Sequence, residues 1–254
     1  MGMSKITEPT VFVVDPDPAT RETVHSVASG LHLPCESFAD GLDFVNSFEP
    51  HRPGCLLLEL RIPGMSGLMI QERLARSSAI LPLIFLARSP SVSVAIHVMR
   101  AGALHFFEKP LHEHELWSVI QEAVQIDQER RQSRSETESI QMQLGRLSEI
   151  EIAVLELLAT GKNKRAIAEE LDKSVRTVDH HRTQLMRKLK MNSTEALLCF
   201  ALAAEQRGLL GPTRVPSKNH EKNGFHKDNN GFAAAINSHN GHNLETGAWR
   251  RAFQ

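Results

Sequence analysis

The sequence predicts an α/β protein that begins with a doubly wound, five-stranded parallel sheet and ends in an all-helical domain. Short, continuously apolar runs recur through residues 1–110, and segments with helical spacing separate them. Such runs are typical of strands that crossover helices bury on both faces. From about residue 115 onward no strand pattern recurs and the spacing is helical. The expected strands are 11–14, 34–38, 55–60, 81–87 and 104–108.

Length and composition exclude several classes of protein. The 254 residues suggest two domains at about 100 to 200 residues per domain. With 41% hydrophobic and 23% charged residues, the chain is neither collagen-like nor disordered throughout. No apolar run reaches the roughly 20 residues of a membrane helix, and the start has no signal-peptide core. We expect a cytoplasmic protein that contacts no membrane.

The three cysteines predict neither a disulfide framework nor a zinc site. Cys35, Cys55 and Cys199 are odd in number, widely spaced and set in apolar stretches.

Charge is distributed unevenly along the chain: residues 1–125 carry 9 Lys and Arg against 14 Asp and Glu, whereas residues 147–207 carry 10 Lys and Arg against 9 Asp and Glu. This shift toward basic residues is a weak indication that the second half binds nucleic acid.

The expected boundaries are a sheet domain over 8–125, a helical linker over 126–146, a helical domain over 147–209 and a tail over 210–254. The last helix of the sheet domain is expected to run on into the linker; its early apolar residues Val119, Ile120 and Val124 would permit coiled-coil pairing near its start, and nothing supports pairing after residue 126. The tail is rich in Asn, Gly and His and has few aliphatic residues, so it is predicted to be disordered.

Four helices are expected in the second domain. Ser148 and Glu151 form a capping box that opens the first, and Gly161 ends it. A short second helix is placed around 166–171, and Ser174 is the expected N-cap of a third that ends near Leu189. The last begins at 192 or 193 and ends at 208.

Five segments carry a resemblance to a known family. VVDPDPATRE at 13–22, LELRIPGMSG at 58–67 and MRAGALHFFEKP at 99–110 resemble the receiver domain of bacterial two-component response regulators, which has a CheY/flavodoxin-like fold. LSEIEIAVLELLATGK at 147–162 and SVRTVDHHRTQLMRKL at 174–189 resemble the LuxR-type helix-turn-helix of the NarL/FixJ class. The resemblance implies phosphorelay signal transduction, double-stranded DNA as a partner, transcription regulation, and a protein that is not an enzyme.

The receiver chemistry of that family uses an Asp acceptor, an acidic pair that holds Mg²⁺, a Ser or Thr, and a Lys. The matching acceptor is Glu59, the acidic pair reads Asp15 and Pro16, the hydroxyl position is Ala87, and Lys109 is retained. Asp17 lies beside the pair. Phe106 matches the aromatic switch position, although as part of a buried strand it is equally expected in the core.

These departures predict that the receiver site is degenerate. Mg²⁺ requires near-octahedral oxygen ligands, and proline supplies no carboxylate. Glu59 is one methylene longer than Asp, which moves its carboxylate out of the in-line position of phosphoryl transfer. No cofactor or metal is expected, apart from weak divalent-ion binding by Asp15 and Asp17. Glu59 is either a partial mimic of the phosphorylated state or a relic paired with Lys109, and a surviving acceptor is the least favoured alternative.

The third helix of the second domain has the pattern of a DNA-reading helix. Val178, His181, Leu185 and Leu189 fall on one face, which must pack inward. The resemblance implies base contacts in the major groove from Asp179, His180 and Thr183 on the other face. It implies phosphate contacts from Lys164, Arg165, Lys173, Arg176, Thr177, Arg182 and Lys188.

A homodimer is expected because symmetric dimers read paired half-sites. The resemblance places the dimer surface on the last helix, at Leu197, Leu198, Ala201, Leu202 and Glu205. Pairing of receivers through 92–124 is the alternative. The leading hypothesis is a DNA-binding transcriptional regulator that is phosphorylation-independent or constitutively poised through Glu59. The alternatives are a conventional phosphorelay regulator phosphorylated at Glu59, and a receiver that acts mainly as an adaptor docking a histidine kinase or another regulatory protein.

Overall fold

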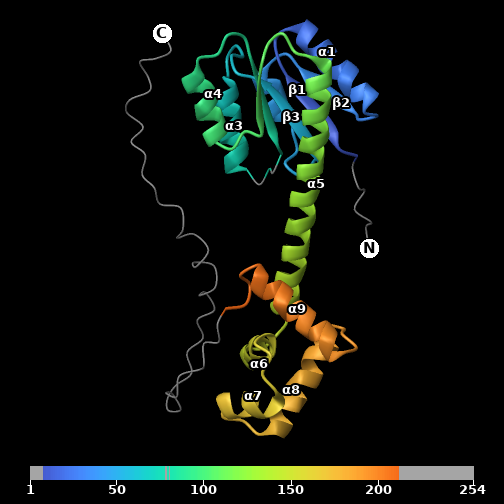
Figure 1. The fold of residues 1–254 in the computed structure, drawn as a ribbon, viewed down its shortest axis with the longest axis vertical. Coiled ribbons are helices and arrows are strands. Elements are labelled where there is room, and N and C mark those ends of the chain that lie inside the picture. Colours follow the sequence, from blue (N-terminus) through green and yellow to red (C-terminus); the bar gives the residue numbers. More distant parts are fainter. Residues whose placement is uncertain (1–7, 78, 80, 212–254) are drawn as a thin grey trace. The chain divides into compact units, whose positions relative to one another are not determined.

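A computed structural model describes residues 8–77, 79 and 81–211 of the protein. The first domain contains five parallel strands in the order β2-β1-β3-β4-β5 (Figure 1). Their bounds are β1 Thr10–Val14, β2 Cys35–Phe38, β3 Gly54–Glu59, β4 Leu83–Ala87 and β5 His105–Glu108. The predicted doubly wound sheet is confirmed, with strand ends shifted by one or two residues.

The helices of this domain cover both faces of the sheet. They are α1 Pro18–Gly30, α2 Gly41–Ser47, α3 Gly67–Arg76, α4 Val92–Arg100 and α5 Glu113–Leu144. Apolar side chains of α1 and α5 pack on one face, and those of α2, α3 and α4 pack on the other. Because all five strands are parallel, their carboxyl ends lie along the same side of the sheet, where α/β sheets place their functional residues.

Strand β3 shows why the apolar runs are continuous. All six of its residues are buried. Leu56 and Leu58 belong to the cluster under α2, α3 and α4, whereas Cys55 and Leu57 belong to the cluster under α1 and α5. Because successive side chains point to opposite faces, both faces demand apolar residues. Each buried Leu contributes about 1.5–3 kcal/mol through removal of apolar surface from water.

Helix α5 runs without a break through the region expected as a linker. Its early apolar residues Val119 and Ile120 are buried in the core of the first domain and Val124 packs against that core, so these residues are not available for the coiled coil considered from sequence. Leu144 at its other end belongs to the core of the second domain. Between these ends, i,i+4 contacts such as Arg134 with Glu138 support a polar, exposed helix.

The second domain consists of α6 Glu149–Ala159, α7 Lys164–Glu170, α8 Val175–Lys188 and α9 Thr194–Gln206. The capping box of Ser148 and Glu151 is present as predicted. Helix α7 begins earlier than the expected residue 166, because the Asn163 side chain accepts from the Arg165 and Ala166 amides.

The expected boundary of the tail at residue 210 is wrong, since Leu210 is buried in the core of the second domain. The remainder of the expected tail, 212–254, lies outside the described residues.

Among the helices that the structure describes, none has the length and apolar character needed to cross a bilayer.

Candidate functional site

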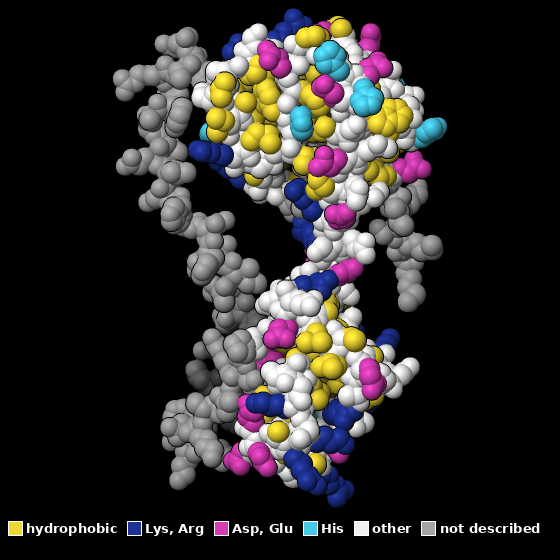
Figure 2. Space-filling view, viewed as in Figure 1, with side chains coloured by type: hydrophobic (Ala, Val, Ile, Leu, Met, Phe, Trp, Pro, Cys, Tyr) yellow, Lys and Arg dark blue, Asp and Glu magenta, His cyan; other side chains and the backbone are white. Residues whose placement is uncertain are grey.

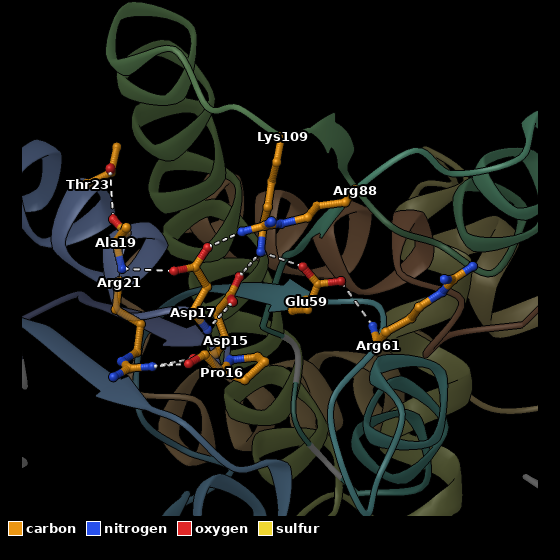
Figure 3. A network of polar contacts seen from close by, with 10 residues as sticks. All are labelled: Asp15, Pro16, Asp17, Ala19, Arg21, Thr23, Glu59, Arg61, Arg88 and Lys109. Atoms are coloured by element: carbon orange, nitrogen blue, oxygen red, sulfur yellow. Dashed lines mark hydrogen bonds and ion pairs between the residues drawn. The ribbon is translucent and has the colours of Figure 1, made fainter.

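The strand-end site of the first domain is a buried group of charges around Lys109 (Figure 3). Lys109 follows β5, Asp15 follows β1, and Glu59 ends β3. The Lys109 Nζ lies 2.5 Å from Asp15 Oδ2 and 2.5 Å from Glu59 Oε2. The three side chains are only 8%, 0% and 8% exposed, so one ammonium bridges two carboxylates away from water.

Backbone groups fix the two carboxylates from their other sides. Asp15 Oδ1 accepts from the Asp17 amide at 2.9 Å, and Glu59 Oε1 accepts from the Arg61 amide at 3.0 Å. Burial raises the pKa of the Asp15 carboxyl above its ordinary value, while the hydrogen bond from Lys109 acts in the opposite direction. The peptide bond between Lys109 and Pro110 is cis.

A second cation closes the same edge of the sheet. Arg88 follows β4, and its guanidinium reaches Asp17 Oδ2 at 2.5 Å across a separation of 71 residues in sequence. Asp17 also caps α1 by accepting from the Ala19 amide. The hydrogen bond from Arg88 lowers the pKa of the Asp17 carboxyl. Arg88 is not among the residues predicted from the sequence. The signal that could have identified it is its position directly after Ala87, at the carboxyl end of β4.

The residues present do not fit a Mg²⁺ site. Pro16 supplies no carboxylate, and the carboxylates of Asp15, Asp17 and Glu59 are each paired with an ammonium or guanidinium. Mg²⁺ needs oxygen ligands that are free to close on it. In the part of the chain that the structure describes, no three metal-binding side chains gather into a suitable group.

The other two expected positions lie in the apolar interior. Ala87 is 2% exposed and belongs to the core. Phe106 is half-buried and packs against the same cluster. This contact fits the interpretation of Phe106 as a core residue, and its role as a switch stays a prediction.

A second buried charge, which no local sequence pattern indicates, lies at the amino ends of the strands. Asp127 on α5 is fully buried, accepts from the Gly54 amide at 2.8 Å and pairs with Arg131 at 2.8 Å. Arg131 in turn donates to the carbonyls of His51 and Arg52. Gly54 has a φ of +139°, and a Cβ there would lie 1.8 Å from the Thr10 carbonyl oxygen, so only glycine fits. This network fixes α5 to the loop before β3.

The second domain presents a basic surface around α7 and α8, where Figure 2 shows Lys and Arg side chains gathered over the lower end of the domain. The inward face of α8 is confirmed in Val178, Leu185 and Leu189, which are buried; His181 is half-buried. On the other face His180 and Thr183 are exposed. Asp179 is about half exposed and pairs with Lys164 at 2.6 Å.

The predicted phosphate-contacting residues divide into two groups. Lys164, Arg165, Lys173 and Arg176 are exposed. Thr177, Arg182 and Lys188 are half-buried and, like exposed Lys164 with Asp179, have partners inside the domain: Thr177 shares a hydrogen bond with Ser174, Arg182 donates to Thr194, and Lys188 lies 2.6 Å from buried Glu151. For Lys188 the prediction is not supported, because moving it to DNA would leave the Glu151 carboxylate buried without that cation.

The predicted dimer surface on α9 is also divided. Leu197 and Ala201 are fully buried in the core of the domain, so they cannot belong to an interface of the folded domain. Leu198 and Leu202 are exposed by 36% and 39%, and Glu205 is exposed. The predicted dimer surface is therefore reduced to these three residues.

Comparisons with known proteins agree with this arrangement. Residues 11–121 match the response regulator receiver domain, and residues 146–201 match the bacterial regulatory proteins of the luxR family. The chain is 31% identical over 191 residues to response regulator protein TmoT of Ectopseudomonas mendocina, covering 75% of this chain and 87% of that protein. The chain belongs to the response regulator family.

Two further proteins are similar to this chain over about three quarters of its length. Nodulation protein W of Bradyrhizobium diazoefficiens is 30% identical to this response regulator over 76% of this chain and 85% of its own length. The solved structure of response regulator StyR is similar, with 34% identity and a TM-score of 0.67, and covers 76% of this chain and 98% of its own. The predicted combination of a receiver with a LuxR-type helix-turn-helix is confirmed.

Proposed function

We propose that this response regulator acts in the cytoplasm and controls transcription, and that its second domain binds DNA without phosphorylation of the receiver. The family assignment itself supports transcription regulation by a DNA-binding output domain. Independence from phosphorylation is supported by the contact of 2.5 Å between Glu59 Oε2 and Lys109 Nζ. This contact holds the carboxylate of Glu59, at the acceptor position, against the lysine.

The neighbouring residues favour the same conclusion. The Lys109 ammonium is already shared between Glu59 and Asp15, so its charge is satisfied within the protein. Ala87 has no hydroxyl with which to bind a phosphoryl oxygen. Without a Mg²⁺ site, the charge that develops on a transferring phosphoryl group would lack its usual stabilisation.

The test is the affinity of the purified, unmodified protein for a duplex of its own upstream region, with and without Mg²⁺ and a small-molecule phosphodonor. We expect binding that falls steeply with salt and is unchanged by the donor. A tenfold tightening, which equals about 1.4 kcal/mol of coupling, would refute the proposal and favour a conventional acceptor at Glu59. Absence of DNA binding would favour an adaptor receiver instead.

Two substitutions separate a mimic from a relic at Glu59. Glu59→Gln keeps the shape of the side chain and removes its charge, so a mimic should lose DNA affinity, by about tenfold if the coupling has the common size of 1–3 kcal/mol. Glu72→Gln on exposed α3 is the matched control and should change nothing. Equal affinities for both variants and the unmodified protein would mean that the charge at Glu59 no longer regulates binding.

The partners proposed for the whole protein are double-stranded DNA, a second copy of the chain and a kinase or other regulatory protein on the receiver. The homodimer would use the exposed α9 residues Leu198, Leu202 and Glu205. Base contacts are proposed for Asp179, His180 and Thr183, and phosphate contacts for Arg165, Lys173 and Arg176 on the exposed surface.

A further inference from the structure

The ion pair between Lys164 and Asp179 joins the two helices of the helix-turn-helix. Lys164 is the first residue of α7, and Asp179 lies in the second turn of α8. Their Nζ and Oδ1 atoms are 2.6 Å apart, and each side chain is 46% exposed. The pair therefore lies on the surface that is proposed to face DNA.

Capping and packing hold both ends of this pair in place. Asn163 caps α7 and so fixes Lys164 as its first residue, while Ser174 caps α8 by accepting from the Thr177 amide. Ile167 of α7 and Val178 of α8 are both buried in the same core. Since Val178 directly precedes Asp179, the position of the carboxylate is determined by the rigid interior of the domain.

An acidic side chain on a DNA-binding face has two opposing effects. Its charge is repelled by the phosphate backbone, which lowers affinity for every sequence. Its oxygens can also accept a hydrogen bond from the N4 amino group of cytosine, which discriminates between base pairs. A lysine that neutralises the carboxylate reduces the repulsion, and because Lys164 contacts Oδ1, it orients a group that has further acceptor capacity.

We propose that Lys164 is a positioning residue for sequence recognition, which orients Asp179 toward the amino group of one cytosine in the major groove. This inference rests on the proposed DNA-reading role of α8. It differs from the phosphate contact predicted for Lys164 from the sequence, because a phosphate contact adds affinity without discriminating between sequences.

The experiment selects binding sites from a randomised DNA duplex library with the full-length protein and with variants. The variants are Lys164→Met, Asp179→Ala and the double substitution. Lys173→Met is the matched control, because Lys173 is an exposed lysine at the turn between α7 and α8. Circular dichroism melting of each variant checks that the domain is folded, and affinities for selected and scrambled duplexes are measured over a range of salt concentrations.

The unmodified protein should prefer cytosine at one position of each half-site. Lys164→Met should reduce that preference by about tenfold, the discrimination of one good base contact, and leave the other positions unchanged. Asp179→Ala should remove the same preference, and the double variant should lose no more than Asp179→Ala alone. Lys173→Met should weaken binding to all sequences equally and reduce the salt slope by about one.

Three results would overturn the inference. One is a uniform loss of affinity in Lys164→Met with every base preference retained, as for the control. Another is a double variant whose losses of preference multiply, since independent residues give that result. The third is a half-site without a cytosine preference that depends on Asp179. If the unmodified protein selects no sequence at all, the proposed DNA-reading function fails as well, which distinguishes that failure from the others.

Discussion

Replacing Lys109 by Met should destabilise the receiver domain by about 3–5 kcal/mol, the cost of removing one partner from a buried ion pair. The structure justifies the upper part of the range, because this one ammonium pairs with both Asp15 and Glu59 at 2.5 Å. The substitution keeps most of the aliphatic stem but leaves two carboxylates in the interior. Since a domain is stable by about 5–15 kcal/mol, the variant should remain folded but markedly weakened.

A matched control is available in the same domain. Arg76 and Glu72 lie 3.8 Å apart on exposed α3, with side chains 83% and 72% exposed. Exposed pairs contribute about 0–1 kcal/mol, so Arg76→Met should have a small effect. The comparison separates the consequence of burial from that of removing any positive charge.

Urea unfolding followed by tryptophan fluorescence measures both variants. The chain has two tryptophans, and Trp249→Phe leaves Trp117 on α5 as the only one. A Cβ at Gly30 would come within 2.6 Å of the Trp117 ring, so this ring packs against α1 and reports on the receiver domain. A Lys109→Met loss within about 0.5 kcal/mol of the Arg76→Met loss would refute the reasoning.

The pH dependence of Lys109→Met gives a second check with a definite sign. Without the ammonium, the folded-state pKa of the buried Asp15 carboxyl should rise further above its ordinary value. A raised folded-state pKa stabilises the protein below the unfolded-state value and loses that contribution as pH increases through the folded-state value. The deficit of Lys109→Met relative to the unmodified protein should therefore shrink as pH falls from 7 toward 4. A deficit independent of pH would show that unpaired charge is not its cause.

Three further predictions concern contacts outside this group. Arg88→Ala should raise the lowered pKa of Asp17 toward its ordinary value, measured by carboxyl NMR titration; an unchanged pKa would contradict the assigned cause. Asp127→Asn should speed amide hydrogen exchange at Gly54 and along the middle of α5 by at least tenfold, and unchanged exchange would mean that this buried charge is dispensable. Leu202→Glu should weaken self-association in sedimentation experiments at unchanged stability, whereas retained dimers would exclude α9 as the interface.

Local patterns predicted those parts of the fold that depend on neighbours in sequence. The strand run at 55–60 and the capping box of Ser148 with Glu151 were both predictable, because burial on two faces and helix capping leave signatures within a few residues. Helix α7 starts at Lys164, before the expected residue 166, because the Asn163 side chain caps it.

Long-range charge pairs could not be predicted in the same way. Arg88 and Asp17 are 71 residues apart, and Asp127 and Gly54 are 73 apart, so nothing in either local sequence identifies the partner. The local sequence of α9 likewise does not show which of its apolar residues are buried and which are exposed. Leu197 and Leu202 look alike in sequence, and only the packing of α9 on the rest of the domain determines which of them is buried.

The two buried charge networks of the receiver lie at opposite ends of β3 and share one property. Lys109 satisfies Glu59 at the carboxyl end of the strand, and Asp127 satisfies the Gly54 amide at its amino end. Phosphoryl transfer depends on metal ions and cationic side chains that stabilise the charge on the transferring group. Here Lys109 pairs with Asp15 and Glu59, and Arg131 pairs with Asp127, so the buried charges at both ends have partners within the chain. The proposal of a receiver that does not require phosphorylation rests on the first of these groups, because Lys109 and its two carboxylates already have partners in the folded chain.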